Sequence, residues 1–397
     1  MSRKLSRGAR NIKWIETYCS VPEGSLVGQP VKLRRWQRRE IKNIYDNPAG
    51  TRRAILSFGR KNGKTALSAW ILLLHLVGPE MVENSTIYSA AQSRDQAAIV
   101  FSLAAKTVRL NATLDAVIKI IDSKKQLNCD ETGTVYRALS ADASTNYGLS
   151  PVLIIHDELG QVRGPKSPIY EALETSVAGQ SAPLSIIIST QAPNPNDLLS
   201  ILIDDAQTCA DPRTVLALYS APEELDPFSR KAIKAANPAF GDFQNAEEVL
   251  SMAADAQRMP SREAEFRNLI LNQRVEMHAP FLARSIWELG KDSPPDFGDA
   301  EVYAGLDLSA VSDLTAVVYI AKINGVWAVK PRFWLPADGL EEKSRQDRVS
   351  YDLWARAGYI ETTPGKSISY EYVAALLFED AQRMNLKRIA FDRYNFK

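Results

Sequence analysis

The sequence contains few of the residues that build disulfide frameworks or zinc sites. Its 397 residues include only three cysteines and three histidines. The cysteines, Cys19, Cys129 and Cys209, lie far apart and lack the spacing of metal ligands. We therefore expect no zinc centre, and a reducing, intracellular setting fits this cysteine usage best.

Long apolar runs and an excess of either charge are also missing. The apolar segment from Ile71 to Val77 is interrupted by His75 and is soon ended by Gly78-Pro79, so it cannot span a bilayer. The N-terminus is basic and polar, without the apolar core of a signal peptide. These absences predict that the protein has no membrane partner. The net charge of +1 means that any DNA-binding surface must be local rather than global.

The composition that remains is that of an ordinary globular protein. Hydrophobic residues make up 45% and charged residues 24% of the chain, and its length is typical of two domains. Residues 1 to about 30 are polar, and we expect them to be irregular. From about residue 53 to 219, strand-like and helix-like segments alternate, which predicts a parallel sheet covered by helices on both faces.

A phosphate-binding loop is predicted at residues 57–65. A short apolar segment precedes it and a helix-prone segment follows it, the order in which backbone N–H groups hold a polyphosphate. Lys64 is expected on the β- and γ-phosphates, and the Thr65 hydroxyl on Mg²⁺. The loop deviates from the usual pattern, because Phe58 stands where the first glycine belongs. A basic surface turn before a helix is the alternative.

A second motif, residues 151–158, is an almost wholly apolar run that ends in Asp157 and Glu158. Such a run predicts a buried central strand of a parallel sheet. Two carboxylates at its tip are costly unless a cation meets them, and nucleotide-bound Mg²⁺ supplies that cation. We expect Asp157 to hold the metal and Glu158 to orient and deprotonate the attacking water. An ordinary acidic turn is the alternative, which the upstream Lys64 makes unfavourable.

The apolar run at residues 183–188 predicts a third strand, which ends in Ser189, Thr190 and Gln191. Small hydroxyl and amide side chains at the end of a neighbouring strand can sense the γ-phosphate and transmit its loss. A polar junction between a strand and a loop explains these three residues about equally well.

Residues 33–45 predict a helix whose apolar stripe continues through Ile41, Ile44 and Tyr45. Its four arginines could face phosphates, although a solvated basic face explains them at least as well. Gln37 lies upstream of the phosphate loop, where it could read the edge of an adenine base.

The second half of the chain has a different texture. Helical segments are predicted from about residue 228 to 275, and residues 292–298 are the clearest linker. Three strands joined by short turns follow the linker and predict an antiparallel meander. A helix over residues 370–384 and a fourth strand over residues 388–392 complete this part.

Two strands of this part end in aspartates, Asp307 and Asp392. If neighbouring strands bring them together, divalent ions about 4 Å apart could stabilise the attacking and leaving oxygens of a phosphodiester. Aspartates suit this role because Mg²⁺ and Mn²⁺ prefer hard oxygen ligands. For either residue alone, a simple strand cap is the better explanation. Asp313 lies nearby, where an Asx-type turn explains it equally well.

These motifs, in this order, resemble the large subunit of tailed-bacteriophage terminases. The resemblance covers nearly the whole chain and rests also on short stretches that are weak singly but specific as an ordered set. Those stretches are Pro22-Glu23-Gly24, Gly28-Gln29-Pro30, Leu33, Trp36-Gln37, Gln92 to Phe101, Ala236-Asn237-Pro238 and residues 266–273. The resemblance implies an α/β chain with a P-loop (ASCE-type) ATPase domain at residues 1–220, a helical lid and linker at 221–295 and an incomplete ribonuclease H-like nuclease domain at 296–397.

Carried over to this sequence, the family motifs imply two sites. Glu158 is the expected catalytic base, Arg60 the charge-stabilising arginine in cis, and Asp307 and Asp392 the nuclease acids. The expected nucleotide-binding residues are Gln37, Gly59, Arg60, Lys61, Asn62, Gly63, Lys64, Thr65, Ser189, Thr190 and Gln191. The expected metal ligands are Thr65 and Asp157 at the ATP site and Asp307 and Asp392 at the nuclease site. The implied cofactors are ATP and Mg²⁺, with Mg²⁺ or Mn²⁺ at the nuclease site.

The resemblance further implies a motor that pumps double-stranded DNA into a procapsid in the cytoplasm of the bacterial host, and an endonuclease that cuts concatemeric DNA. The expected partners are DNA, a portal protein, a small terminase subunit and further copies in a ring. The family carries a third nuclease acid far downstream, whereas this sequence stops at Lys397. We therefore expect ATPase competence but weak or absent cleavage from these 397 residues. Robust metal-dependent nicking would contradict that expectation.

Three other functions fit parts of the sequence. A helicase or translocase without a nuclease would share the nucleotide motifs, but it predicts a second RecA-like half after about residue 220. A non-enzymatic, nucleotide-dependent scaffold would require Glu158 to be idle. A small-molecule kinase is disfavoured because no acceptor-pocket signature accompanies the loop.

Overall fold

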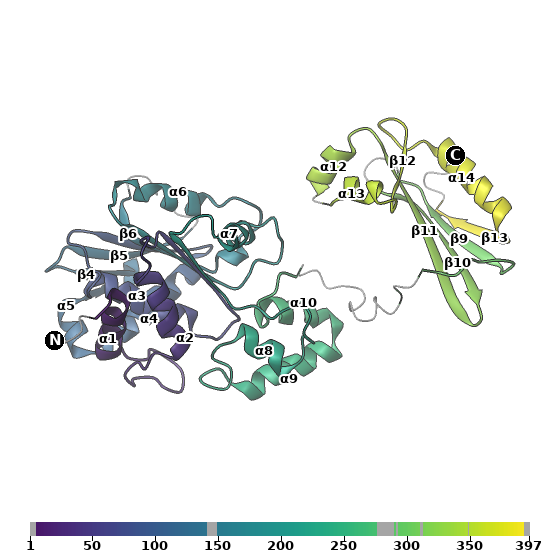
Figure 1. Ribbon diagram of the computed structural model, residues 1–397. Coiled ribbons are helices and arrows are strands. Elements are labelled where there is room, and N and C mark those ends of the chain that lie inside the picture. Colours follow the sequence, from purple (N-terminus) through teal and green to yellow (C-terminus); the bar gives the residue numbers. More distant parts are fainter. Residues whose placement is uncertain are drawn as a thin grey trace. The chain divides into compact units, whose positions relative to one another are not determined.

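The computed structural model describes residues 5–140, 149–275, 290, 293–309, 313–347 and 349–392. The chain divides into two compact units, Met1–Arg284 and Ser285–Lys397, each built around its own β-sheet (Figure 1). Within the described residues, no helix combines the length and the apolar character needed to cross a lipid bilayer.

An eight-stranded sheet forms the centre of the first unit, in the order β3-β4-β5-β2-β6-β7-β1-β8. The strands from β5 to β8 in this order run parallel, as the alternation of strands and helices predicted. Strands β3 and β4 extend the sheet as an antiparallel edge. The strands are β1 (Arg53–Ser57), β2 (Thr86–Ala91), β3 (Lys119–Ile121), β4 (Gln126–Cys129), β5 (Thr134–Ser140), β6 (Pro151–Asp157), β7 (Leu184–Ser189) and β8 (Thr214–Leu218).

Helices cover both faces of this sheet, with α3 and α4 on one face and α6 and α7 on the other (Figure 1). Alternation along the strands explains the two layers. Leu56 of β1 packs into the cluster around α3, whereas its neighbour Ile55 packs with Leu199 and Ile203 of α7. The helices of this unit are α1 (Arg7–Tyr18), α2 (Arg35–Tyr45), α3 (Lys64–Leu76), α4 (Arg94–Arg109), α5 (Ala112–Val117), α6 (Pro168–Ser176), α7 (Leu198–Gln207), α8 (Arg230–Ala236), α9 (Ala246–Arg258) and α10 (Pro260–Leu269), with 3-10 turns at η1 (Asp122–Lys124), η2 (Leu159–Gln161) and η3 (Val177–Gly179).

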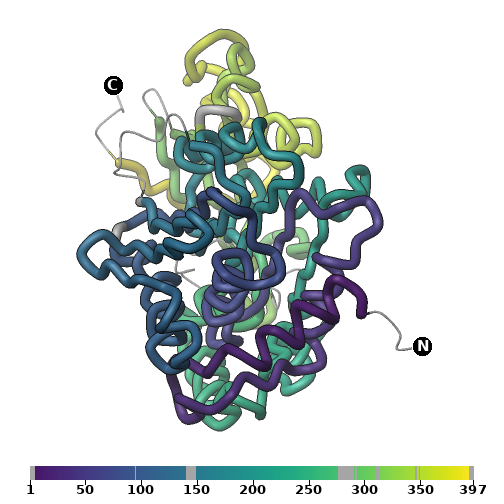
Figure 2. Tube along the Cα trace, turned by 90° about the vertical axis from the view of Figure 1, so that its left-hand side faces the viewer, coloured from purple at the N-terminus to yellow at the C-terminus, as the bar shows by residue number. Residues whose placement is uncertain are grey.

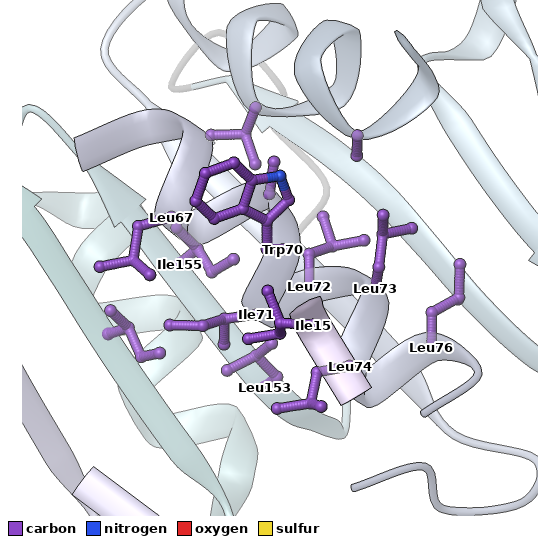
Figure 3. Close-up of a cluster of buried hydrophobic side chains, with 14 of the residues drawn as sticks. Ile15, Leu67, Trp70, Ile71, Leu72, Leu73, Leu74, Leu76, Leu153 and Ile155 are labelled. Carbon is purple, nitrogen blue, oxygen red and sulfur yellow. The ribbon is translucent and has the colours of Figure 1, made fainter. Parts of the chain in front are cut away.

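Helix α3 is buried along almost its whole length, because its sequence is apolar on every side. Figure 3 shows Trp70 and Ile71 of this helix among side chains that include Ile15 of α1 and Ile155 of β6. A helix that is apolar all round can be stable only inside a core. Its packing therefore fixes the position of its N-terminus at Lys64, where the phosphate loop ends.

The N-terminal segment is helical, so the expectation of an irregular N-terminus is wrong. Helix α1 buries Ile12 and Ile15 and runs along the outside of the first unit (Figure 2). The other buried residues of this helix are Gly8 and Asn11. Because neither is apolar in the usual scales, the sequence shows no helical repeat of apolar residues here. The side chain of Asn11 donates to Glu80 at 2.8 Å and so joins the helix to the loop after α3.

Helices α8, α9 and α10 form a small bundle within the first unit (Figure 1). A break at Asn237-Pro238 ends α8, in keeping with the helical stretch expected from about residue 228 to 275. The bundle has its own apolar cluster, which includes Ile233, Val249 and Phe266. The ends of α8 and α10 accept backbone hydrogen bonds from the phosphate loop.

The second unit contains a five-stranded sheet in the order β12-β11-β10-β9-β13. Strands β9, β10 and β11 form the predicted antiparallel meander, and β13 pairs with β9 in parallel. This sheet is unlike the second parallel half that a helicase would need. The elements are β9 (Val302–Asp307), β10 (Thr315–Ile323), β11 (Val326–Pro336), α12 (Leu340–Asp347), α13 (Tyr351–Arg356), β12 (Glu361–Thr363), α14 (Tyr370–Arg383) and β13 (Leu386–Phe391).

Candidate active site

Three neighbouring parallel strands end at one edge of the first sheet and bring the predicted nucleotide motifs together. Ser57 at the end of β1 pairs with Ser189 at the end of β7. Asp157 at the end of β6 pairs with Ile188, one residue earlier on β7. Ligands of open α/β sheets bind at the carboxyl ends of the strands. The phosphate loop, the paired acids and the Ser-Thr-Gln motif therefore meet at the edge of the sheet where ligands bind in folds of this type.

The phosphate loop presents free backbone donors at the start of α3. Lys61 and Gly63 adopt left-handed conformations, with φ of 65° and 71°. The N–H groups of residues 61–64 have no hydrogen-bond acceptor in the part of the chain that the structure describes. Unpaired N–H groups at a helix N-terminus attract a phosphate through their partial charges. This part of the loop fits a polyphosphate.

The Lys64 amine lies inside the loop and close to the two acids of β6. Its Nζ atom donates to the carbonyl of Phe58 at 2.6 Å and to that of Gly59 at 3.2 Å. Burial lowers the pKa of Lys64 to about 8, although the carboxylates of Glu158 and Asp157 act in the opposite direction. The amine and both acids therefore lie near enough for their charges to act on one another, and their joint role in binding a nucleotide stays a prediction.

Asp157 is 6% exposed, and its carboxyl group holds its proton more tightly than an ordinary aspartic acid does. Burial and the neighbouring Glu158 raise its pKa to about 7, against the opposing effect of Lys64. A divalent cation would favour the ionised form. Thr65 is the second residue of α3 and its side chain is partly exposed, so its hydroxyl is available as a second oxygen ligand. A carboxylate and a hydroxyl are the hard donors that Mg²⁺ prefers, and these two residues fit that ion.

Glu158 occupies a strained position at the mouth of the site. Its φ is 53°, a left-handed conformation that costs energy for a residue with a Cβ atom. Its backbone N–H donates to Ile188 at 2.8 Å, and its carboxylate accepts from the Ser189 hydroxyl at 3.4 Å. The same hydroxyl accepts from the N–H of Gly160 at 2.8 Å. Ser189 therefore links the expected catalytic base to the third strand.

Gln191 points to the segment that follows α10. Its side-chain amide donates to the carbonyl of Asn272 and accepts from Arg274 at 3.0 Å. Its backbone N–H donates to the Asn272 side chain at 2.7 Å. Thr190 is 4% exposed and lies between this contact and Ser189. Sensing of the γ-phosphate by these residues stays a prediction, but the structure shows where a signal from Gln191 would go.

Gln37 is buried at the start of α2. Its side-chain oxygen accepts from the backbone N–H of Arg34 at 2.8 Å and so caps the helix, while a contact of its amide nitrogen with adenine stays a prediction. The Arg34 guanidinium binds Asp242 at 2.6 and 2.8 Å and lies 5.5 Å from the ring centre of Phe243. Residues 242 and 243, which the sequence did not suggest, therefore belong to the surroundings of the nucleotide site.

Sequence reasoning also missed the residues that hold the first half of the loop. Gly59 donates its N–H to Ala236 at 3.1 Å, and Arg60 donates its N–H to Leu269 at 2.8 Å. The side chain of Arg60 is exposed. Asn237 belongs to one of the family-like stretches, but the sequence alone suggested no role for it. The sequence did contain a hint, because asparagine is one of the residue types that end helices.

Strand pairing in the second unit brings the two predicted nuclease acids together. Phe391 of β13 pairs with Leu306 of β9, so the next residues, Asp392 and Asp307, lie side by side on one face of the sheet. Asp313 precedes β10. Two carboxylates fit a divalent metal in type, although no cluster of three or more His, Cys, Asp or Glu side chains suited to a metal occurs among the described residues.

The fold and these residues define a P-loop nucleotide hydrolase joined to a second domain with paired strand-end aspartates. Comparison with known families extends this class. Residues 35–207 match the ATPase domain of the terminase large subunit, and residues 216–397 match the endonuclease domain of the terminase large subunit. The chain belongs to the terminase large subunit family. The predicted α/β fold class, with ATPase and endonuclease domains of a DNA-packaging terminase, is confirmed.

Individual relatives and solved structures resemble the chain to different degrees. The terminase large subunit of Enterobacteria phage HK97 is 50% identical over 391 residues, which are 98% of this chain and 77% of the relative. The crystal structure of the HK97 bacteriophage large terminase aligns with a TM-score of 0.66 and 49% identity, over 98% of this chain and 81% of that one. The large terminase of a thermophilic bacteriophage is a more distant match, with a TM-score of 0.41 and 11% identity over 90% of this chain and 82% of that one.

Proposed function

We propose that this chain hydrolyses ATP at the site around Lys64 and uses the energy to move double-stranded DNA into a procapsid. The observation that carries the proposal is the convergence of Lys64, Asp157 and Glu158 at one edge of the sheet. The second unit supplies the endonuclease that cuts concatemeric DNA. Both proposals apply the family's activities to particular residues of this chain.

At the ATP site, each residue has a task that its position supports. Gln37 contacts the adenine, the N–H groups of residues 61–64 hold the phosphates, and Lys64 turns from Phe58 towards the β- and γ-phosphates. Thr65 and Asp157 hold Mg²⁺, which neutralises charge on the phosphates when bound. Glu158 orients and deprotonates the attacking water. The exposed Arg60 stabilises charge as it develops in the transition state.

At the nuclease site, Asp307 and Asp392 hold Mg²⁺ or Mn²⁺ on neighbouring strands. The metal supplies charge stabilisation for the phosphodiester oxygens. The two carboxylates position it on the exposed face of β9 and β13.

The partners follow from the same proposal. DNA is held mainly through its phosphates, and a portal protein, a small terminase subunit and a ring of further copies complete the machine. It acts in the cytoplasm of the bacterial host. We divide the chain into the ATPase domain at residues 1–220, the helical lid and linker at 221–295 and the nuclease domain at 296–397.

The test of the ATP site is a pair of substitutions in the full chain. Glu158→Gln should keep the binding of Mg²⁺ and ATP but lower the turnover rate by about 10²–10⁴-fold, the usual contribution of a general base. Lys64→Ala should weaken binding itself. Turnover can be followed by phosphate release and binding by a fluorescent ATP analogue. The exposed Glu171→Gln on α6 is a matched control, and full turnover by the Glu158→Gln variant would refute the role of Glu158.

A further inference from the structure

We propose that Asn237 is a positioning residue that couples the phosphate loop to helices α8–α10 by way of Asn62. The inference rests on the proposed function, because it assumes that the loop binds the phosphates of ATP. Asn237 follows the last residue of α8 and is 1% exposed. An amide at this position can hold two helix ends and the loop at once, because it has two donors and two acceptor positions.

The side chain of Asn237 uses all of these positions. Its Nδ2 atom donates to the carbonyls of Ile233 and Ile270, each at 2.8 Å, and so joins the end of α8 to the end of α10. Its Oδ1 atom accepts from Asn62 at 2.7 Å and from Gln244 at 3.1 Å. A buried amide with every position satisfied is held in one orientation, and loss of one partner leaves the others unpaired.

The backbone of Asn62 belongs to the proposed phosphate-binding loop, and its side chain contacts the segment that follows α8. Its backbone N–H is among the free donors of the loop, whereas its side chain is fully buried. Its Nδ2 atom also donates to the carbonyl of Gly59 at 3.0 Å, and its Oδ1 atom accepts from the N–H of Ala239 at 3.0 Å. Asn62 and the segment from Asn237 to Ala239 are therefore bonded in both directions.

Backbone contacts make the same junction tight. Besides the bonds from Gly59 and Arg60 to the ends of α8 and α10, Gln244 donates to the carbonyl of Arg60 at 2.9 Å. A Cβ atom on Gly59 would lie 2.3 Å from Asn237 Oδ1 and 2.5 Å from the Ile270 carbonyl. Glycine is required at residue 59 because the helices approach the loop, rather than because the loop turns there.

A physical consequence follows from this arrangement. Phosphates bound to the N–H groups of residues 61–64 fix the backbone of Asn62, and with it the direction of its side chain. Fixing that side chain favours one position of Asn237 and of the two helix ends that it joins. Thermodynamic linkage is reciprocal. The factor by which bound phosphate favours this position of the helices is therefore also the factor by which helices in this position raise the affinity of the loop for phosphate. Asn237 thus makes nucleotide binding and the order of α8–α10 depend on each other.

The experiment compares Asn237→Ala with Asn245→Ala in the full chain. Asn245 caps α9 by accepting from the N–H groups of Glu247 and Glu248, and its side chain is exposed. Its loss therefore weakens α9 but removes no hydrogen bond of Asn62 or Asn237. Hydrogen exchange is measured with and without Mg²⁺ and a non-hydrolysable ATP analogue, and KM and kcat are measured with ATP.

In the wild type and in Asn245→Ala, the analogue should slow exchange both in residues 58–66 and in residues 246–270. In Asn237→Ala it should slow exchange in residues 58–66 alone. The KM for ATP should rise about tenfold, because of the four lost hydrogen bonds only the one from Asn62 reaches the loop, and kcat should change less because Lys64, Asp157 and Glu158 are intact. Protection of residues 246–270 by the analogue in Asn237→Ala would overturn the coupling role. Absence of any protection of residues 58–66 in the wild type would instead refute nucleotide binding at this loop.

A second variant keeps the test decisive if Asn237→Ala fails to fold. Gln244→Ala removes one donor to Asn237 and one to the Arg60 carbonyl but leaves the Asn62–Asn237 bond. In this variant the nucleotide analogue should still protect residues 246–270 from hydrogen exchange, but less than it does in the wild type. Unchanged protection in this variant would count against the junction. A double-mutant cycle between Asn62→Ala and Asn237→Ala should be non-additive, and strict additivity would contradict direct coupling.

Discussion

Asn272 is a single buried side chain that joins three strand ends next to the nucleotide site. Its Nδ2 atom donates to the Ser57 hydroxyl and to the carbonyl of Tyr219, each at 3.0 Å. Its Oδ1 atom accepts from the N–H of Gln191 at 2.7 Å. Ser57 is the last residue of β1, and Tyr219 and Gln191 lie just after β8 and β7, so one amide holds the edge of the sheet where the phosphate loop begins.

Two substitutions of Asn272 separate its side chain from its backbone conformation. Its φ of 54° is left-handed, a conformation that glycine adopts freely and alanine only at a cost in energy. Asn272→Gly should cost about 2–3 kcal/mol because it leaves buried partners unpaired, and Asn272→Ala should cost about 1 kcal/mol more because it adds strain. Urea unfolding of the two variants checks the order. A more stable alanine variant would show that backbone strain at this position is unimportant.

Glu174 makes the stability of the first unit depend on pH. Burial acts to raise its pKa, but hydrogen bonds from His156 and Ser185 and the charge of Arg52 outweigh burial and lower the pKa to about 2. The unfolded value is the ordinary 4.5, so the ionised carboxylate stabilises the fold above pH 4.5, and this contribution is lost as the pH falls towards 2.

The corresponding variant is Glu174→Gln. We expect a loss of about 2 kcal/mol in the free energy of unfolding at pH 7, because the amide keeps the shape but not the charge. The difference from the wild type should shrink as the pH is lowered from about 5 to 3. Denaturant unfolding at several pH values measures it, with the exposed Glu171→Gln on the same helix as control. A difference that is independent of pH would mean that packing, not ionisation, is responsible.

At the scale of elements, the register between β9 and β13 determines whether a metal site can form. The pairing of Leu306 with Phe391 sets Asp307 beside Asp392. A shift of one residue would turn one carboxylate to the opposite face, where α14 packs on Val302 and its neighbours.

The prediction for this pair is a metal-binding defect. Asp307→Asn and Asp392→Asn should each abolish Mn²⁺ binding to the second unit, because a pair of hard oxygen ligands becomes a single one. Asp313→Asn should leave it largely intact. Titration with Mn²⁺, followed by electron paramagnetic resonance, distinguishes the three variants. A stronger effect of Asp313→Asn than of the other two would move the site to the turn before β10.

Elements with a strong apolar signal could be predicted, and those held by polar contacts could not. The buried strands β6 and β7 and the meander β9–β11 followed from apolar runs and short turns. Helix α1 was missed because its buried stripe includes Gly8 and Asn11. The junction of Asn62 with Asn237 joins residues 175 positions apart, so no local pattern could reveal it. The acids at strand ends were found because parallel strands place their ends together.

At the scale of the whole molecule, the helices α8–α10 belong with the first unit, although residues 216–397 as a group match the endonuclease family model. The compact unit runs to Arg284, and the ends of α8 and α10 bind the phosphate loop within it. A chain cut near residue 220 therefore loses the partners of Gly59, Arg60 and Asn62.

Two fragments test this division. Residues 1–275 should unfold cooperatively and bind a fluorescent ATP analogue with an affinity close to that of the full chain. Residues 1–220 should bind it much more weakly, because at least three buried donors or acceptors of the loop lose their partners, at roughly 1–3 kcal/mol each. Calorimetry and the binding titration measure both properties. Equal affinity of the two fragments would show that the loop needs no support from the helices.

At Glu158 the residue that best suits the left-handed backbone is not the residue that activity requires. Glycine would adopt the φ of 53° without steric conflict, and in that respect it is the residue that folding alone would choose. A Glu158→Gly chain should therefore tolerate heat at least as well as the natural one while losing the carboxylate that turnover needs. A screen for thermostability alone would therefore favour glycine at residue 158 and yield an inactive protein.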